Sequence, residues 1–94
     1  MIHYIICKWK NKEEVTAPVE SRIRELFSGA DSIPGVEKAE IVKNAVDRDN
    51  RFDLMIRVYM NKDALPVWDN SDIHRRWKEE FGGFIDKKTI FDEE

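Results

Sequence analysis

Apolar residues recur with different periods along the chain, and each change of period marks an expected element. Residues 2–9 carry apolar side chains at both odd and even positions, which predicts a strand buried on both faces. Apolar residues then recur every three or four positions up to residue 27, which predicts an amphipathic helix. Because Pro18 is tolerated only in a first turn, this helix is expected to begin near Thr16.

The middle of the chain predicts two further strands joined by a loop. Residues 36–46 are apolar on one side and charged on the other, which is typical of a strand at a sheet edge. Residues 47–50, Asp-Arg-Asp-Asn, predict a hairpin loop. Residues 52–60 place five apolar side chains at strict alternation, which predicts a strand with one buried face.

The last third predicts a second helical region and a final strand. Residues 62–82 have an apolar stripe at helical spacing, and Asn61 precedes them as a cap. An Asp-Asn-Ser-Asp run interrupts the stripe, so a break is expected there, with Asn70 or Ser71 capping the second half. Two glycines end the helix, and residues 85–91 predict the last strand.

The resulting order, β-α-β-β-α-β, predicts an α+β fold of the ferredoxin-like type within a single domain, residues 1–94. Its four-stranded antiparallel sheet would carry both helices on one face. The opposite face would leave a large apolar patch in water, which is uncommon on a small monomer. We therefore expect a homodimer in which two such sheets face each other, through an interface that includes Tyr4, Ile6, Met55 and Tyr59.

Composition narrows the class of protein further. The chain has 94 residues, of which 41% are hydrophobic and 37% charged, and this mixture excludes a disordered chain. No apolar run approaches the roughly 18–20 residues of a membrane span, so no membrane partner is expected. The net charge of -3 argues against a nucleic-acid partner. The start of the chain lacks the features of a signal peptide, and the single cysteine cannot form an internal disulfide, so a cytoplasmic location is expected.

Two histidines are the candidates for acid–base chemistry. His3 lies on the first strand and His74 in the second helical region, and an imidazole titrates near neutral pH. The only cysteine, Cys7, lies within an apolar strand and is expected to act as a small hydrophobe rather than as a nucleophile. No metal site is expected, because two separated histidines and one cysteine provide no ligand spacing. No glycine-rich phosphate-binding loop is present either, and no cofactor is expected.

Several segments together resemble the stress-responsive A/B barrel (Dabb) family of dimeric α+β barrels, nearly from end to end. They are Ile-His-Tyr-Ile-Ile-Cys-Lys-Trp-Lys at the start, Ile-Pro-Gly-Val before the second strand, Phe-Asp-Leu at the third, Ser-Asp-Ile-His in the second helix and Ile-Phe-Asp at the end. The resemblance implies the paired-sheet barrel, and it implies enzymes that need no cofactor. A plant polyketide cyclase of this family carries out aldol chemistry with one histidine on the first strand and one in the second helix, which match His3 and His74.

The same enzyme uses a tyrosine six residues before the helix histidine, where this chain has Trp68, and an indole cannot exchange a proton as a phenol can. The family's His-Pro-x-His is half present, since Ser71-Asp72 stands where His-Pro would be. Apart from these two departures, the resemblance implies His74 and His3 as catalytic residues of a cofactor-free cyclase, lyase or isomerase.

Four aromatic side chains are candidates for the wall of a pocket that binds an apolar or aromatic molecule between sheet and helices: Trp68, Trp77, Trp9 and Phe81. Core packing is the alternative explanation for the helical aromatics. On that alternative the chain is a non-catalytic stress-response or scaffold homodimer. An RNA-recognition module shares the order of elements, but residues 51–60 lack its glycine–aromatic pattern, and the acidic balance disfavours it.

Overall fold

The computed structural model describes residues 1–94, and its elements follow the expected order. The strands and helices are β1 (Ile2–Trp9), α1 (Ala17–Phe27), β2 (Val36–Lys43), β3 (Leu54–Met60), α2 (Leu65–Asp69), α3 (Asp72–Phe81) and β4 (Ile85–Glu93). The second helical region is divided into α2 and α3, as the interrupted stripe predicts. None of these helices has the length and apolar character needed to cross a membrane.

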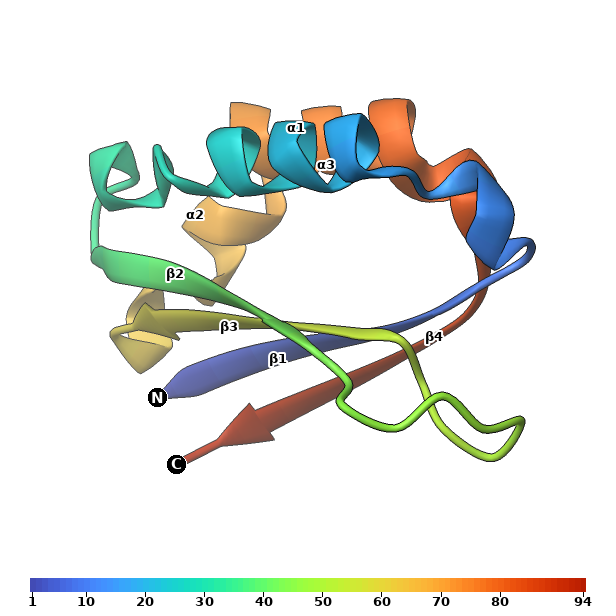
Figure 1. Ribbon diagram of the computed structural model, residues 1–94. Helices are drawn as coiled ribbons and strands as arrows, with labels where there is room; N and C mark the ends of the chain where they lie inside the picture. The colour runs from blue at the N-terminus through green and yellow to red at the C-terminus, as the bar shows by residue number, and fades with distance from the viewer.

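The four strands form one antiparallel sheet in the order β2-β3-β1-β4, with β2 and β4 at its edges. The helices all lie on one face of this sheet (Figure 1). This is the predicted ferredoxin-like α+β architecture. Because the first and last strands are neighbours, the two ends of the chain come together, with His3 opposite Asp92.

Side chains alternate along β1 and β3 between a covered and an open face. In β1 the odd positions from His3 to Trp9 are buried beneath the helices, whereas Ile2, Tyr4 and Ile6 are only partly buried. The expectation that β1 is buried on both faces is therefore wrong for the single chain, because the helices cover one side of the sheet only. The other side remains open.

Aromatic rings fill the space between the sheet and the helices. Phe27 of α1 lies with its ring centroid 6.0 Å from that of Trp68 and 5.4 Å from that of Trp77. Trp77 in turn lies 5.6 Å from Phe81. All four side chains are almost fully buried. Aromatic pairs at these separations add to the stabilisation that burial provides, so this cluster anchors the helices to the sheet.

Local interactions explain the ends of the elements. The turn before β2 requires Gly35, whose φ is +83° and whose missing Cβ would lie 2.7 Å from the Cβ of Ala64. β2 ends at residue 43 and β3 begins at residue 54, so both are shorter than predicted. Asn44 causes the difference, since its side chain donates to the Phe52 carbonyl and accepts from the Val46 N–H, which turns the chain out of the ladder.

The break between α2 and α3 is held by the Ser71 hydroxyl. It accepts a hydrogen bond from the backbone N–H of His74 at 3.2 Å and donates one to the carbonyl of Trp68 at 2.7 Å. Ser71 is thus the N-cap of α3, as predicted, and it links the two candidate site residues on either side of the break. Thr16, at the N-cap of α1, makes no such bond with its side chain.

Ser71→Ala should lower the free energy of unfolding by about 1 kcal/mol, because it removes a capping interaction. Thr16→Ala is the matched control, and it should cost less than about 0.5 kcal/mol, since no side-chain bond is lost there. Urea titrations followed by circular dichroism measure both. Equal losses in the two variants would contradict the capping role of Ser71.

Candidate functional site

His3 is buried on the helix side of β1, near the point where the two chain ends meet. Its Nδ1 lies 2.5 Å from Oδ1 of Asp92 on β4. A carboxylate can only accept, so Nδ1 carries the hydrogen of this bond. Nε2 has no partner within the chain. Only one fully buried polar side-chain atom lacks a hydrogen-bond partner, and that atom is Nε1 of Trp68. Because Nε2 of His3 also lacks a partner, it must keep some contact with solvent.

His74 lies in the first turn of α3 and is partly exposed. Its Nδ1 donates to the carbonyl of Asp69 at 3.0 Å, which again leaves Nε2 without a partner within the chain. Burial lowers the pKa of His74 below its ordinary value, and the hydrogen bond to Asp69 acts in the opposite direction. The charges of Lys78 and Lys88 lower this pKa further. His74 is therefore favoured as the neutral imidazole, the form that can accept a proton.

Trp68 contacts both histidines. Its ring centroid lies 6.3 Å from that of His3 and 5.5 Å from that of His74. The side chain is fully buried, and its indole N–H donates to no atom of the protein. An unpaired buried donor of this kind costs about 1–3 kcal/mol. The structure thus gathers three of the six expected site residues into one cluster, with a hydrogen-bond donor at its centre.

The other expected site residues lie apart from this cluster or inside the core. Trp77 and Phe81 pack within the aromatic cluster between sheet and helices. Trp9 lies at the opposite end of β1 from His3, about 20 Å along the strand. There its backbone N–H donates to Asp53, and its side chain packs near the start of the chain's first helical turn.

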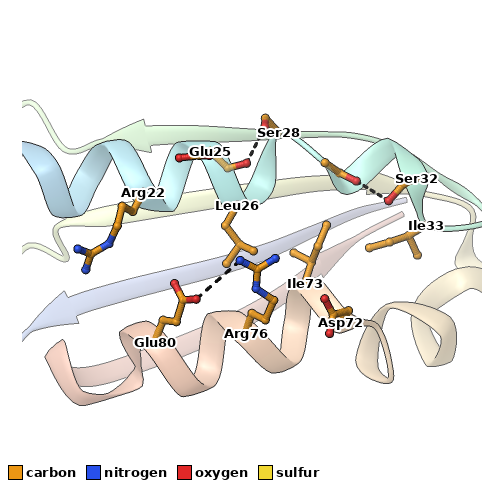
Figure 2. A pocket seen from close by; sticks show the side chains of 11 residues that line it. Arg22, Glu25, Leu26, Ser28, Ser32, Ile33, Asp72, Ile73, Arg76 and Glu80 are labelled. Carbon is orange, nitrogen blue, oxygen red and sulfur yellow. Dashed lines mark hydrogen bonds and ion pairs between the residues drawn. The ribbon is translucent and has the colours of Figure 1, made fainter.

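The hollows described on the surface lie outside the aromatic interior. One of about 680 Å³ runs between α1 and α3, with Arg22 and Arg76 on its rim and Leu26 and Ile73 at its base (Figure 2). Another, of about 420 Å³, opens beside His74 and is lined by polar residues of the α2–α3 break and α3: Asp69, Asn70, Ser71, His74, Arg75, Lys78 and Glu79. Of the two histidines, only His74 borders either of these hollows.

Cys7 is fully buried on the helix side of β1. Burial raises the pKa of its thiol to about 12, although the charge of Lys88 acts in the opposite direction. A thiol with this pKa is protonated at neutral pH and is a poor nucleophile. This agrees with the expectation that Cys7 serves as a small hydrophobe.

Asp92 is a site residue that sequence reasoning missed. Its bond to His3 joins positions 89 residues apart, and it exists only because β1 and β4 pair in this register. The expected order of elements contained a signal for this pair. In that order the first and last strands are antiparallel neighbours, which places a residue near the start of the chain opposite one near its end. Such a carboxylate fixes the tautomer and orientation of the ring that it contacts.

No model of a protein family matches the sequence, and no curated protein matches it. Solved structures do match. A dimeric ferredoxin-like protein of unknown function from Thermobifida fusca superposes with a TM-score of 0.76 at 12% identity, over 96% of this chain and 85% of that one. A Dabb family protein with a ferredoxin-like fold from Mesorhizobium loti superposes with a TM-score of 0.71 at 14% identity, over 99% of this chain and 93% of that one.

The chain has the ferredoxin-like fold of a Dabb family protein. The hydroxynitrile lyase from Passiflora edulis superposes on this chain with a TM-score of 0.72 at 12% identity, over 96% of this chain and 87% of that chain. At these identities the likeness is one of fold. The expected fold class is therefore confirmed, and the activity has to be argued from the site.

The lowered pKa of His74 makes stability depend on pH. The unfolded chain binds the proton at about the ordinary value of 6.5, and the folded chain binds it at lower pH. The contribution of His74 to the free energy of unfolding is therefore fully present above pH 6.5. It is lost as the pH falls from 6.5 toward the pKa of His74 in the folded chain. Urea unfolding of the wild type should show this loss, and His74→Gln should remove it. A ring titration by NMR with a midpoint at or above the ordinary value would contradict the prediction.

Proposed function

We propose that the chain is a Dabb family member that binds a small molecule and transfers a proton to or from it without a cofactor, using His74 and His3. One observation carries the proposal. Both imidazoles have their Nδ1 atoms fixed by an acceptor and leave Nε2 without a partner, and both rings contact Trp68, whose indole N–H also has no partner. Removal of a proton next to a carbonyl requires one positioned base, which a free Nε2 supplies, and a hydrogen-bond donor for the developing oxyanion.

In this proposal His74 is the base. It is the more accessible of the two rings, it borders a hollow of about 420 Å³, and its lowered pKa favours the neutral form. His74 takes a proton from carbon next to a substrate carbonyl. His3, oriented by Asp92, is the second proton acceptor or donor of the site. Trp68 cannot exchange a proton, so its role is limited to donating a hydrogen bond to substrate oxygen or to packing.

We also propose that two chains associate through the open face of the sheet. The face carries the expected residues Tyr4, Ile6, Met55 and Tyr59, each only partly buried in the single chain. Phe91 adds a ring that is 60% exposed and lies 6.3 Å from the ring of Tyr4. Covering such a surface with a second sheet removes apolar area from water, which favours association by roughly 25 cal/mol for each Å² buried.

A non-catalytic homodimer is the second candidate, and the filled interior favours it. Phe27, Trp68, Trp77 and Phe81 are almost fully buried, and ring contacts join them in the order Trp68, Phe27, Trp77 and Phe81. The ring of Trp68 also contacts both histidine rings. If the chain is such a homodimer, His74 has only a structural role, as a residue near the start of α3 that is hydrogen-bonded to the Asp69 carbonyl. The His3–Asp92 pair then serves to hold the two ends of the chain together.

Ile6→Glu or Met55→Glu should weaken dimerisation by at least about 100-fold, because a carboxylate would be buried in an apolar interface. Val67→Glu is the matched control, since Val67 is equally apolar, is 43% exposed, and lies on α2 in the helix layer. Sedimentation velocity over a range of concentrations measures the association. A wild type that stays monomeric throughout would contradict the proposed dimer.

Proton transfer can be tested without knowing the natural substrate. The wild type should accelerate the exchange of α-protons with deuterium oxide in a panel of small ketones and 3-oxo acids, followed by NMR. His74→Asn should reduce the rate by about 100-fold or more, as expected for loss of a general base. His3→Asn should reduce it less. Arg76→Gln, on the α1 side of α3, is the control and should leave the rate unchanged.

Circular dichroism and thermal unfolding must show that each variant is folded. If the folded wild type accelerates exchange in no compound, or if His74→Asn retains the full rate, the catalytic proposal fails and the second candidate stands. The two outcomes separate the functions because only the first needs a free Nε2 on His74.

A further inference from the structure

The helix side of β4 is exposed, and it carries a lysine. In the β1–β4 register Lys88 lies opposite Cys7, Ile90 opposite Ile5, and Asp92 opposite His3. Opposed residues of an antiparallel pair point to the same face, so these three β4 residues share the helix side with their buried partners on β1. All three are nevertheless exposed, Ile90 to 46%. The helix layer therefore leaves the inner face of this edge strand uncovered.

Helix α3 presents a second lysine on the side away from α1. One stripe of α3 packs into the core through Ile73, Trp77 and Phe81. A second stripe faces α1 and includes Arg76 and Glu80 (Figure 2). His74 and Lys78, four residues apart, form the remaining stripe.

The electrostatics of His74 agree with this placement of the two lysines. The charges of both Lys78 and Lys88 lower the pKa of His74. Lys88 also acts to lower the pKa of Cys7, which lies beneath it on β1. Lys78 and His74 both line the hollow of about 420 Å³ on α3, and Lys88 lies on the helix side of β4 opposite Cys7. We call His74, Lys78, Lys88 and Ile90 the α3–β4 edge.

Neither lysine of the α3–β4 edge is neutralised within the chain. No carboxylate lies within 4.0 Å of either Nζ. The neighbouring carboxylates are engaged elsewhere, since Asp92 contacts His3 and Glu79 contacts Arg75. Asp69 bonds His74 through its backbone carbonyl, and its charge opposes that of the lysines at the ring. The α3–β4 edge thus carries two lysines that have no carboxylate partner.

We propose that Lys78 and Lys88 bind the carboxylate of a small organic acid, whose apolar part packs on Ile90 and whose reacting carbon lies beside Nε2 of His74. The inference rests on the proposed function and names its substrate class. Like many lysine contacts to anions, these would act through charge rather than through a fixed bidentate geometry. A neutral analogue of the same shape would lose this attraction, and a bare anion would lose the apolar contact.

The test is an NMR titration of the histidine ring signals of the full chain at fixed ionic strength. The probes are phenylacetate, its neutral analogue phenylacetamide, and inorganic phosphate. Phenylacetate should shift the His74 signal and bind more tightly than the other two. Lys78→Gln and Lys88→Gln should each weaken its binding by about three- to fivefold, as expected for partly exposed charge contacts. Binding of phenylacetamide should not change.

Two matched controls come from the same elements. Lys87→Gln removes a lysine of β4 that lies opposite Lys8 in the register, and Arg76→Gln removes a cation of α3 on the α1 side. Both should leave phenylacetate binding unchanged. Equal binding of phenylacetate and phenylacetamide, or an equal loss in Lys87→Gln and Lys88→Gln, would overturn the inference. So would phosphate binding as tightly as phenylacetate, because that would indicate a site for any anion.

These outcomes are distinguishable from failure of the proposed function. Proton exchange that depends on His74, with binding that ignores Lys78 and Lys88, would leave the catalytic proposal intact and remove the substrate class. Binding of phenylacetate that depends on both lysines, without exchange in any compound, would retain the organic-acid site and remove the catalysis.

Discussion

The burial of Trp68 is the constraint on which the rest of the site depends. Its indole fills the space between the sheet and the helices and contacts Phe27, His3 and His74. A side chain of this size in a helix of five residues fixes how closely α2 approaches the sheet. The chain then has to break before α3, and Ser71 provides the hydrogen bonds for that break. The position of His74, in the first turn of α3, follows from these local requirements.

Much of the architecture could be predicted from the sequence because it depends on short-range patterns. Alternation over residues 52–60 and the helical stripes before and after it specify the elements, and Ser71 specifies the break between the last two helices. The ends of β2 and β3 could not be predicted. The Asn44 side chain replaces backbone hydrogen bonds between the two strands there, and it can do so only when both strands are already paired. The His3–Asp92 pair depends on the register of the whole sheet, which no local pattern contains.

The role of the aromatic residues was harder to predict, for a physical reason. An aromatic stripe at helical spacing is needed both for a pocket wall and for a solid core, and the sequence pattern is the same in the two cases. Which of them results depends on whether the facing side chains leave space. Here Trp77 and Phe81 pack against each other and Phe27, whereas Trp9 belongs to the far end of β1. Only Trp68 lies with the histidines.

The unpaired groups around Trp68 form a consistent set. The two imidazoles offer free acceptor atoms, and burial and nearby positive charge lower the pKa of His74. The indole N–H and the two lysines of the α3–β4 edge offer donors and positive charge without a counterpart in the chain. A core built only for packing gains nothing from an unpaired indole N–H, since a hydrocarbon side chain would avoid its cost of about 1–3 kcal/mol. An organic acid bound as its carboxylate would accept from the two lysines and lose a proton from its reacting carbon to an imidazole, so one ligand would complement both the cations and the base.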